Sequence, residues 1–211
     1  MARFFKGGLW DELINAISNL AFFIVAWSSW RLARSLNVQF LSVKLLMYLM
    51  IAIGIGSSLF HTYATSWALL MDVVPITMFQ ICYLWVYTRR VMKLKSIISM
   101  ILIVILVIAS LATLPLKVLN GSISYAPALI YLLGLGIYHF QAKKQSKFLV
   151  LAGAGIFLIA LFFRTIDQYI CPIFPIGAHF LWHIFNGFML YFVTSSLLFN
   201  LKSNKSHSTI N

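Results

Sequence analysis

Seven apolar runs, separated by short polar or basic segments, constrain the fold of this chain most strongly. They lie near 12–33, 40–61, 66–88, 95–115, 122–141, 147–166 and 174–200. Each run is close to the length of about 20 residues that an α-helix needs to cross a bilayer. Because a helix satisfies all its backbone hydrogen bonds within one segment, it is the structure that suits such a run in lipid. We predict an all-α, polytopic membrane protein built as a seven-transmembrane-helix bundle.

Composition excludes the soluble classes of protein. Only 9% of the residues are charged and 62% are hydrophobic, whereas a soluble domain has about 25% charged residues. Seven spans also use most of the 211 residues. We therefore expect a single transmembrane domain over 1–201, followed by a disordered polar tail over 202–211.

The basic residues predict the orientation of the bundle, because cytoplasmic loops are enriched in Lys and Arg. One face would carry twelve of them: Arg31, Arg34, Lys44, Arg89, Arg90, Lys93, Lys95, Lys143, Lys144, Lys147, Lys202 and Lys205. The opposite face would carry four: Arg3, Lys6, Lys117 and Arg164. We predict the N-terminus outside and the C-terminus in the cytoplasm.

The net charge of +12 would suggest nucleic acid as the partner of a soluble protein. In a membrane protein the basic loops report topology instead, so we expect no nucleic-acid partner. The expected environment is the bacterial inner membrane for a prokaryotic protein and an endomembrane for a eukaryotic one.

Polar residues of several spans are predicted to meet in one layer near the outer face. His61 ends the second span, Asp72 lies about two turns into the third, and His179 and His183 lie in the first turns of the seventh. Five further polar residues are predicted at the same depth: Glu12, Asn15, Asn19, Arg164 and Asp167. Intramembrane ionisable residues are costly, so this layer is the candidate functional site.

Histidine spacing indicates a metal site in that layer. His179 and His183 are four residues apart, which puts both imidazoles on one helix face. His61 would complete a three-histidine zinc site with an open fourth position, where bound water has a pKa of about 7. Asp72 is placed to accept a proton from that water, and Ser57 lies one turn before His61.

Each of these residues also has a structural interpretation. A membrane histidine is often an interhelical hydrogen-bond donor, and Asp72 can be the partner of an Arg or a His. Ser57 and Ser58 can bond to the helix backbone, and glycines can allow close helix packing. Glu12, Asn15 and Asn19 can form a polar seam between helices. Two other histidines, His139 and His207, are interpreted as lying outside the site.

Five segments of the chain resemble the alkaline ceramidase family. Residues 54–61 (Gly-Ile-Gly-Ser-Ser-Leu-Phe-His) and 72–75 (Asp-Val-Val-Pro) are similar to its Gly-x-Gly-Ser-x-x-Phe-His and Asp-Glu-x-Pro segments. Residues 179–183 resemble its His-x-x-Trp-His segment. Residues 164–171 resemble an Asp-containing stretch that ends in Cys, and 12–19 resemble the Glu-x-x-Asn-x-x-Ser-Asn opening of the first helix.

This resemblance implies a seven-helix intramembrane zinc hydrolase of the superfamily that includes adiponectin-receptor-like proteins. It implies that His61, His179 and His183 bind zinc, that Asp72 assists proton transfer and that Ser57 stabilises the reacting oxygen. The implied reaction is hydrolysis of the N-acyl amide of ceramide, or of a ceramide-like lipid, to a sphingoid base and a free fatty acid.

The chain departs from the family pattern at several positions. Val73 replaces the second acid of the Asp-Glu segment, and the N-terminal cysteine that would pair with Cys171 is missing. Of the acidic segment that binds calcium in eukaryotic members, only residues 10–12 remain. We therefore expect zinc, in a compact homologue whose natural substrate can differ from ceramide, and the sequence leaves calcium dependence undetermined.

Two alternatives remain open at the level of sequence. One is a lipid ester or phospholipid acyl hydrolase on the same scaffold. The other is a non-enzymatic, receptor-like lipid-binding protein with a structural metal. The sequence leaves the oligomeric state and the acyl-chain preference undetermined.

Overall fold

The computed structural model describes residues 9–208, with side chains described over 13–202. Within this range every regular element is helical. The elements in chain order are α1 (Leu9–Ser18), α2 (Leu20–Ser35), α3 (Leu41–Tyr63), α4 (Ser66–Val86), the π-helix η1 (Tyr87–Val91), α5 (Ser96–Thr113), the 3-10 helix η2 (Val118–Tyr125), α6 (Ala126–Gln141), α7 (Leu149–Ile170) and α8 (His179–Ser208).

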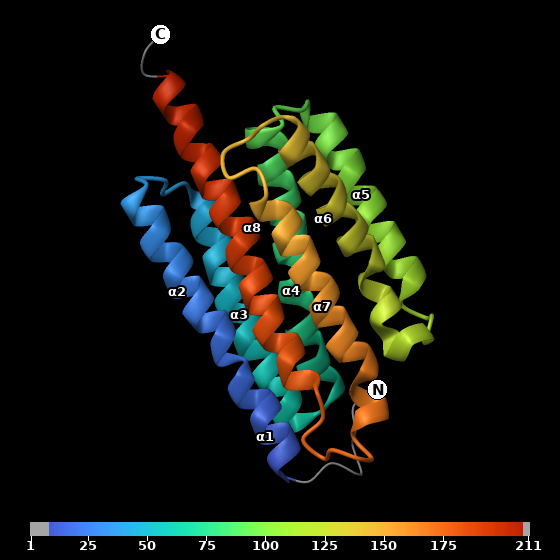
Figure 1. Ribbon diagram of the computed structural model, residues 1–211. Helices are drawn as coiled ribbons and strands as arrows, with labels where there is room; N and C mark the ends of the chain where they lie inside the picture. The colour runs from blue at the N-terminus through green and yellow to red at the C-terminus, as the bar shows by residue number, and fades with distance from the viewer. Residues whose placement is uncertain (1–8, 209–211) are drawn as a thin grey trace.

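Seven of the described helical segments are long and apolar enough to cross a membrane, as predicted. α1 and α2 together make the first, and η1 continues α4 in the third. The segments form one bundle in which α8 runs between the α2–α3 pair and α7 (Figure 1). Large apolar side chains face outward, for example Ile97, Ile108 and Leu111 on α5. Such a surface fits a lipid environment and makes this an integral membrane protein.

The boundaries of the last two spans differ from the predicted ones. α7 continues to Ile170, so Arg164 and Asp167 lie inside the helix and do not close it. α8 begins at His179, after a connection in which Gly177 has a φ of 68°. α8 ends at Ser208, and the division into a domain over 1–201 and a tail over 202–211 stays a prediction. The last part of that segment, 209–211, lies outside the described residues.

The α1 end and the α8 end of the chain lie at opposite ends of the bundle (Figure 1). The predicted sidedness, with the N-terminus outside, stays a prediction. The beginning of α8 and the α3–α4 turn lie at the same end of the bundle as α1 (Figure 1). Residues separated by more than one hundred positions in the chain are thereby placed in one polar layer.

A tight turn and one glycine hold α3 against α4 at that end. Ala64 adopts a left-handed conformation with a φ of 53°, and its N–H donates to the Phe60 carbonyl at 2.9 Å. A Cβ at Gly56 would lie 1.8 Å from the backbone oxygen of Met71. Only glycine therefore permits this approach of the two helices, one residue before Asp72. The interpretation of Gly56 as a packing glycine is confirmed.

Candidate metal centre

Three histidines from two helices meet at the polar end of the bundle. His61 lies in the last turn of α3, His179 is the first residue of α8, and His183 follows one turn later. Each offers a nitrogen, and these nitrogens all lie within 4.8 Å of one another. The ring centroids are 4.9 to 5.2 Å apart. The sequence predicted this meeting of His61 with the His179–His183 pair.

The tautomer of His183 follows from its hydrogen bonds. The Ser18 hydroxyl donates to the backbone carbonyl of Asn15 at 2.7 Å. The Ser18 hydroxyl oxygen also lies 2.7 Å from Nδ1 of His183. With the one proton of the Ser18 hydroxyl on the Asn15 backbone carbonyl, Nδ1 of His183 carries a proton that it can donate to the Ser18 oxygen and to that same carbonyl. Nε2 of His183 is then left with a free lone pair, as a metal ligand requires.

The donor set fits a divalent metal ion. Three imidazole nitrogens with room for a fourth ligand are the arrangement of catalytic zinc sites. His183 is 2% exposed, and its orientation is fixed by a partner on another helix, which is how proteins hold histidine ligands. Imidazole also suits other first-row ions, so the geometry indicates a metal site without selecting the metal.

Asp167 fixes the beginning of α8 and with it the position of His179. Its Oδ1 accepts hydrogen bonds from the backbone N–H groups of Ala178, at 2.7 Å, and His179, at 2.9 Å. The thiol of Cys171 donates to the Asp167 carbonyl oxygen. A carboxylate from α7 therefore satisfies two N–H groups that a helix N-terminus leaves without intrahelical partners.

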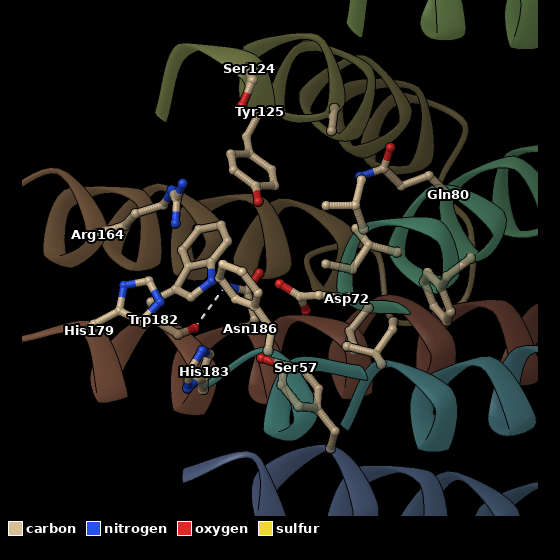
Figure 2. Close-up of a pocket in the computed structure, with 18 of the residues that line it drawn as sticks. Ser57, Asp72, Gln80, Ser124, Tyr125, Arg164, His179, Trp182, His183 and Asn186 are labelled. Carbon is tan, nitrogen blue, oxygen red and sulfur yellow. Dashed lines mark hydrogen bonds between the residues drawn. The ribbon is translucent and has the colours of Figure 1, made fainter. Parts of the chain in front are cut away.

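Asp72 and Ser57 lie beside the three histidines. Both line the same cavity, and the Ser57 hydroxyl donates a hydrogen bond to the Asp72 carboxylate. Figure 2 shows this carboxylate pointing into the cavity, toward the side from which His179 and His183 approach. A carboxylate in this position can exchange a proton with a molecule bound at the histidines.

Besides the histidines, the acids and the serine, the polar layer contains a cation, Arg164. Its guanidinium carbon lies 5.1 Å from the centroid of the Tyr125 ring and 5.3 Å from that of Trp182. The two rings contact each other in a T-shaped arrangement at 4.9 Å. Nε of Arg164 is buried without a hydrogen-bond partner in the described part of the chain. The cation is therefore held by aromatic faces.

The cavity has a volume of about 1090 Å³ and two chemically different parts. The histidines, Ser57, Asp72 and Arg164 line its polar part. Its other part is lined by apolar side chains of α4, α5 and α6, among them Ile76, Phe79, Leu106, Leu132 and Leu135. A cavity of this size and lining fits a lipid with a polar head and a long hydrocarbon chain.

Of the remaining residues predicted for the site, one lines the cavity and one lies behind it in the helix packing. Asn15 lines the cavity, whereas Asn19 is fully buried at the break between α1 and α2 and donates to the Asn15 carbonyl at 3.1 Å. Glu12 belongs to the part of α1 whose side chains lie outside the described residues.

His139 lies outside the metal centre, as expected, but it is the centre of a second buried polar cluster. Its Nδ1 lies 2.6 Å from the Tyr87 hydroxyl, and its Nε2 lies 2.9 Å from the Gln145 carbonyl. A carbonyl only accepts, so Nε2 carries the proton and Nδ1 accepts from Tyr87. Ser196 and Asn200 of α8 complete the cluster. It ties the α6–α7 connection to η1 and α8.

Sequence reasoning did not single out Tyr125, and it quoted Ser18 and Trp182 only as members of the 12–19 and 179–183 segments, without a role. Ser18 follows Asn15 by three residues, so helical spacing placed it on the same face of the predicted first span. Nothing in the sequence marks Tyr125, because η2 contains left-handed residues from Leu119 to Gly121 that no periodicity predicts.

The comparison with protein families gives one result. The profile of the Ceramidase family matches residues 9–210, which is nearly the whole chain and includes all residues of the site described above. No curated protein sequence matches the chain.

Proposed function

This chain belongs to the ceramidase family, and on that premise we propose that it is a zinc-dependent amidase of the membrane. Its substrate is the N-acyl amide of ceramide or of a ceramide-like lipid, and its products are a sphingoid base and a free fatty acid. The observation that carries the proposal is the meeting of three histidines, an acid and a serine at the polar end of a lipid-sized cavity.

His61, His179 and His183 would hold the ion, since they are the described residues that can place three nitrogen ligands together. A zinc ion bound there supplies a water of lowered pKa and polarises a carbonyl oxygen. The chain prepares the ligands in advance, because Ser18 fixes the tautomer of His183 and Asp167 fixes the backbone of His179.

Asp72 would carry the proton of the reaction. Amide hydrolysis needs a base that takes a proton from the attacking water and an acid that gives one to the departing nitrogen. A single carboxylate can do both in sequence when it lies between the two atoms. Asp72 faces the cavity next to the histidines, which is the position this role requires (Figure 2).

Ser57 would act after Asp72 has accepted the proton of the attacking water. Its hydroxyl has one proton, which it donates to the Asp72 carboxylate in the structure. Once Asp72 is protonated it is a weaker acceptor, and the Ser57 proton is free for the oxygen of the reacting carbonyl. A hydrogen bond that strengthens as charge develops on this oxygen stabilises the transition state.

The apolar part of the cavity would hold the acyl chain and exclude water from it. Phe79, Leu106 and Leu132 come from three helices and give this part its hydrocarbon lining. Burial of a CH₂ group is worth about 0.8 kcal/mol, so a long chain contributes most of the binding free energy. The amide is thereby placed at the polar end.

A matched pair of lipids tests the proposal. The purified protein in detergent is incubated with a ceramide and with the ester analogue of the same acyl chain, and the released fatty acid is quantified by mass spectrometry. We expect faster release from the amide and loss of release after chelation. Release from the ester alone would replace the amidase by an acyl ester hydrolase, and release from neither would contradict a hydrolase.

A further inference from the structure

Among the described residues that line the cavity, Arg164 is the only Lys or Arg. It lies on α7 one turn before Asp167, in the polar layer of the bundle. Figure 2 shows it on the side of the cavity that carries His179 and Trp182, with Tyr125 above it. The cation therefore lies where the head of a bound lipid would be.

Among the described residues, the half-buried Arg164 lacks the ion-pair partner that a cation in apolar surroundings normally has. Among the residues that the structure describes it forms no ion pair, and its Nε is buried without a hydrogen bond. The Asp72 carboxylate attracts Arg164 electrostatically, but the hydrogen bond that this carboxylate accepts comes from Ser57. A guanidinium in a membrane-embedded cavity is costly unless an anion or a hydrogen-bond acceptor satisfies it.

The aromatic contacts hold the guanidinium through its planar face and not through its N–H groups. Tyr125 and Trp182 contact it through their ring faces, at 5.1 and 5.3 Å, and accept no conventional hydrogen bond there. Because Nε is covered by protein, a ligand would reach the guanidinium through its terminal N–H groups. A planar, bidentate acceptor such as a carboxylate matches this geometry best.

We propose that Arg164, held between Tyr125 and Trp182, is a subsite for the carboxylate of a lipid bound in the cavity. The subsite itself does not depend on the proposed function, whereas the identity of the lipid that brings the carboxylate does. Hydrolysis of an amide releases a fatty acid, which ionises at neutral pH and lies within the same cavity. A substrate with an acidic group next to its amide nitrogen would bring the carboxylate with its head instead.

Binding measurements test the subsite without catalysis. The affinities of palmitate and of hexadecanol are measured for the detergent-solubilised wild type and for Arg164→Gln. We expect Arg164→Gln to weaken palmitate by about tenfold or more, since a charged hydrogen bond is lost, and to leave hexadecanol unchanged. Equal palmitate affinity in both proteins would overturn the proposal.

Two controls make the result specific. Arg34→Gln removes an exposed arginine in the last turn of α2 and should change neither affinity. Arg164→Lys keeps the charge but loses the fork, so its palmitate affinity should be intermediate. If Arg164→Gln does not fold, the chelated wild type decides: it should prefer palmitate to hexadecanol by about tenfold, and equal affinity overturns the subsite.

The two sources of the carboxylate are separated by kinetics on ceramide and on N-palmitoylglycine. A loss of kcat/KM in Arg164→Gln that is confined to N-palmitoylglycine supports a carboxylate on the substrate head. A change of kcat/KM in Arg164→Gln that is equal for both lipids, together with relief of inhibition by palmitate, supports the product. If the wild type hydrolyses neither lipid, the proposed function fails, whereas the binding result for Arg164 still stands.

Discussion

The Ser18 hydroxyl oxygen lies 2.7 Å from Nδ1 of His183, a residue 165 positions later in the chain. This contact connects α1 to the metal centre, since Ser18 also donates to the Asn15 carbonyl of its own helix. The first helix therefore contributes no metal ligand among its described side chains, but it orients one. The ligands and their hydrogen-bond partners therefore come from four separate helices, α1, α3, α7 and α8.

Ser18→Ala should lower the zinc affinity of the protein about 10- to 100-fold, the usual cost of losing a hydrogen bond to a ligating histidine. Ser18→Thr keeps the hydroxyl and should retain most of the affinity. Competition with a chelator of known affinity measures both. Ser35→Ala is the matched control, because it removes the same type of bond to the backbone on the exposed end of α2. Equal zinc affinity in Ser18→Ala and the wild type would contradict the orienting role.

Asp72→Asn should keep the metal and lose turnover. Asparagine has a similar shape and can accept the Ser57 hydrogen bond, but it cannot take up a proton at the pH of the reaction. We expect kcat to fall by about 10²-fold or more, the usual contribution of a general acid–base group. The metal content is measured on the same sample. An acid with only a structural role would show itself as lost folding, and unchanged turnover would remove Asp72 from the mechanism.

Gly56→Ala should disrupt the packing of α3 on α4. The added Cβ would lie 1.8 Å from the Met71 carbonyl oxygen, so the helices would have to separate next to Asp72. We expect lower thermal stability in detergent and loss of activity, in line with overpacking costs of about 1–3 kcal/mol or more. Gly155→Ala adds the same atom where nothing lies within 4 Å and should be neutral or stabilising. Equal stability of the two variants would contradict the close approach.

Tyr87→Phe should destabilise the protein without removing its metal. It deletes the donor to the fully buried His139, and an unsatisfied buried nitrogen costs about 1–3 kcal/mol. Thermal unfolding monitored in detergent, beside a measurement of zinc content, separates the two effects. Tyr48→Phe, on an exposed side chain of α3, serves as the control. A normal melting temperature in Tyr87→Phe would argue against the second polar cluster as a structural connection.

The seven spans and the main residues of the site could be predicted from the sequence because both depend on short-range periodicity. Length and apolarity define a membrane helix, and the spacing of His179 and His183 puts them on one helix face. The place of His61 followed from alternating span direction, which brings the end of α3 and the beginning of α8 to one end of the bundle.

The rest of the site depends on contacts that periodicity does not contain. Tyr125 contacts Arg164 from the end of η2, and no periodicity predicts the left-handed residues of that element. Asp167 was expected to follow the sixth span, but α7 continues past it so that its carboxylate can accept from the beginning of α8. The single proton of Ser18, and hence the tautomer of His183, becomes evident only from distances between side chains.

Metal content is the measurement that tests the central claim most directly. Detergent-purified wild type and His179→Ala are analysed by inductively coupled plasma mass spectrometry after removal of loosely bound ions. We predict about one zinc per chain in the wild type, as three histidines can hold one ion, and its loss in a folded His179→Ala. A folded wild type without stoichiometric metal, or an unchanged zinc content in His179→Ala, would contradict the account.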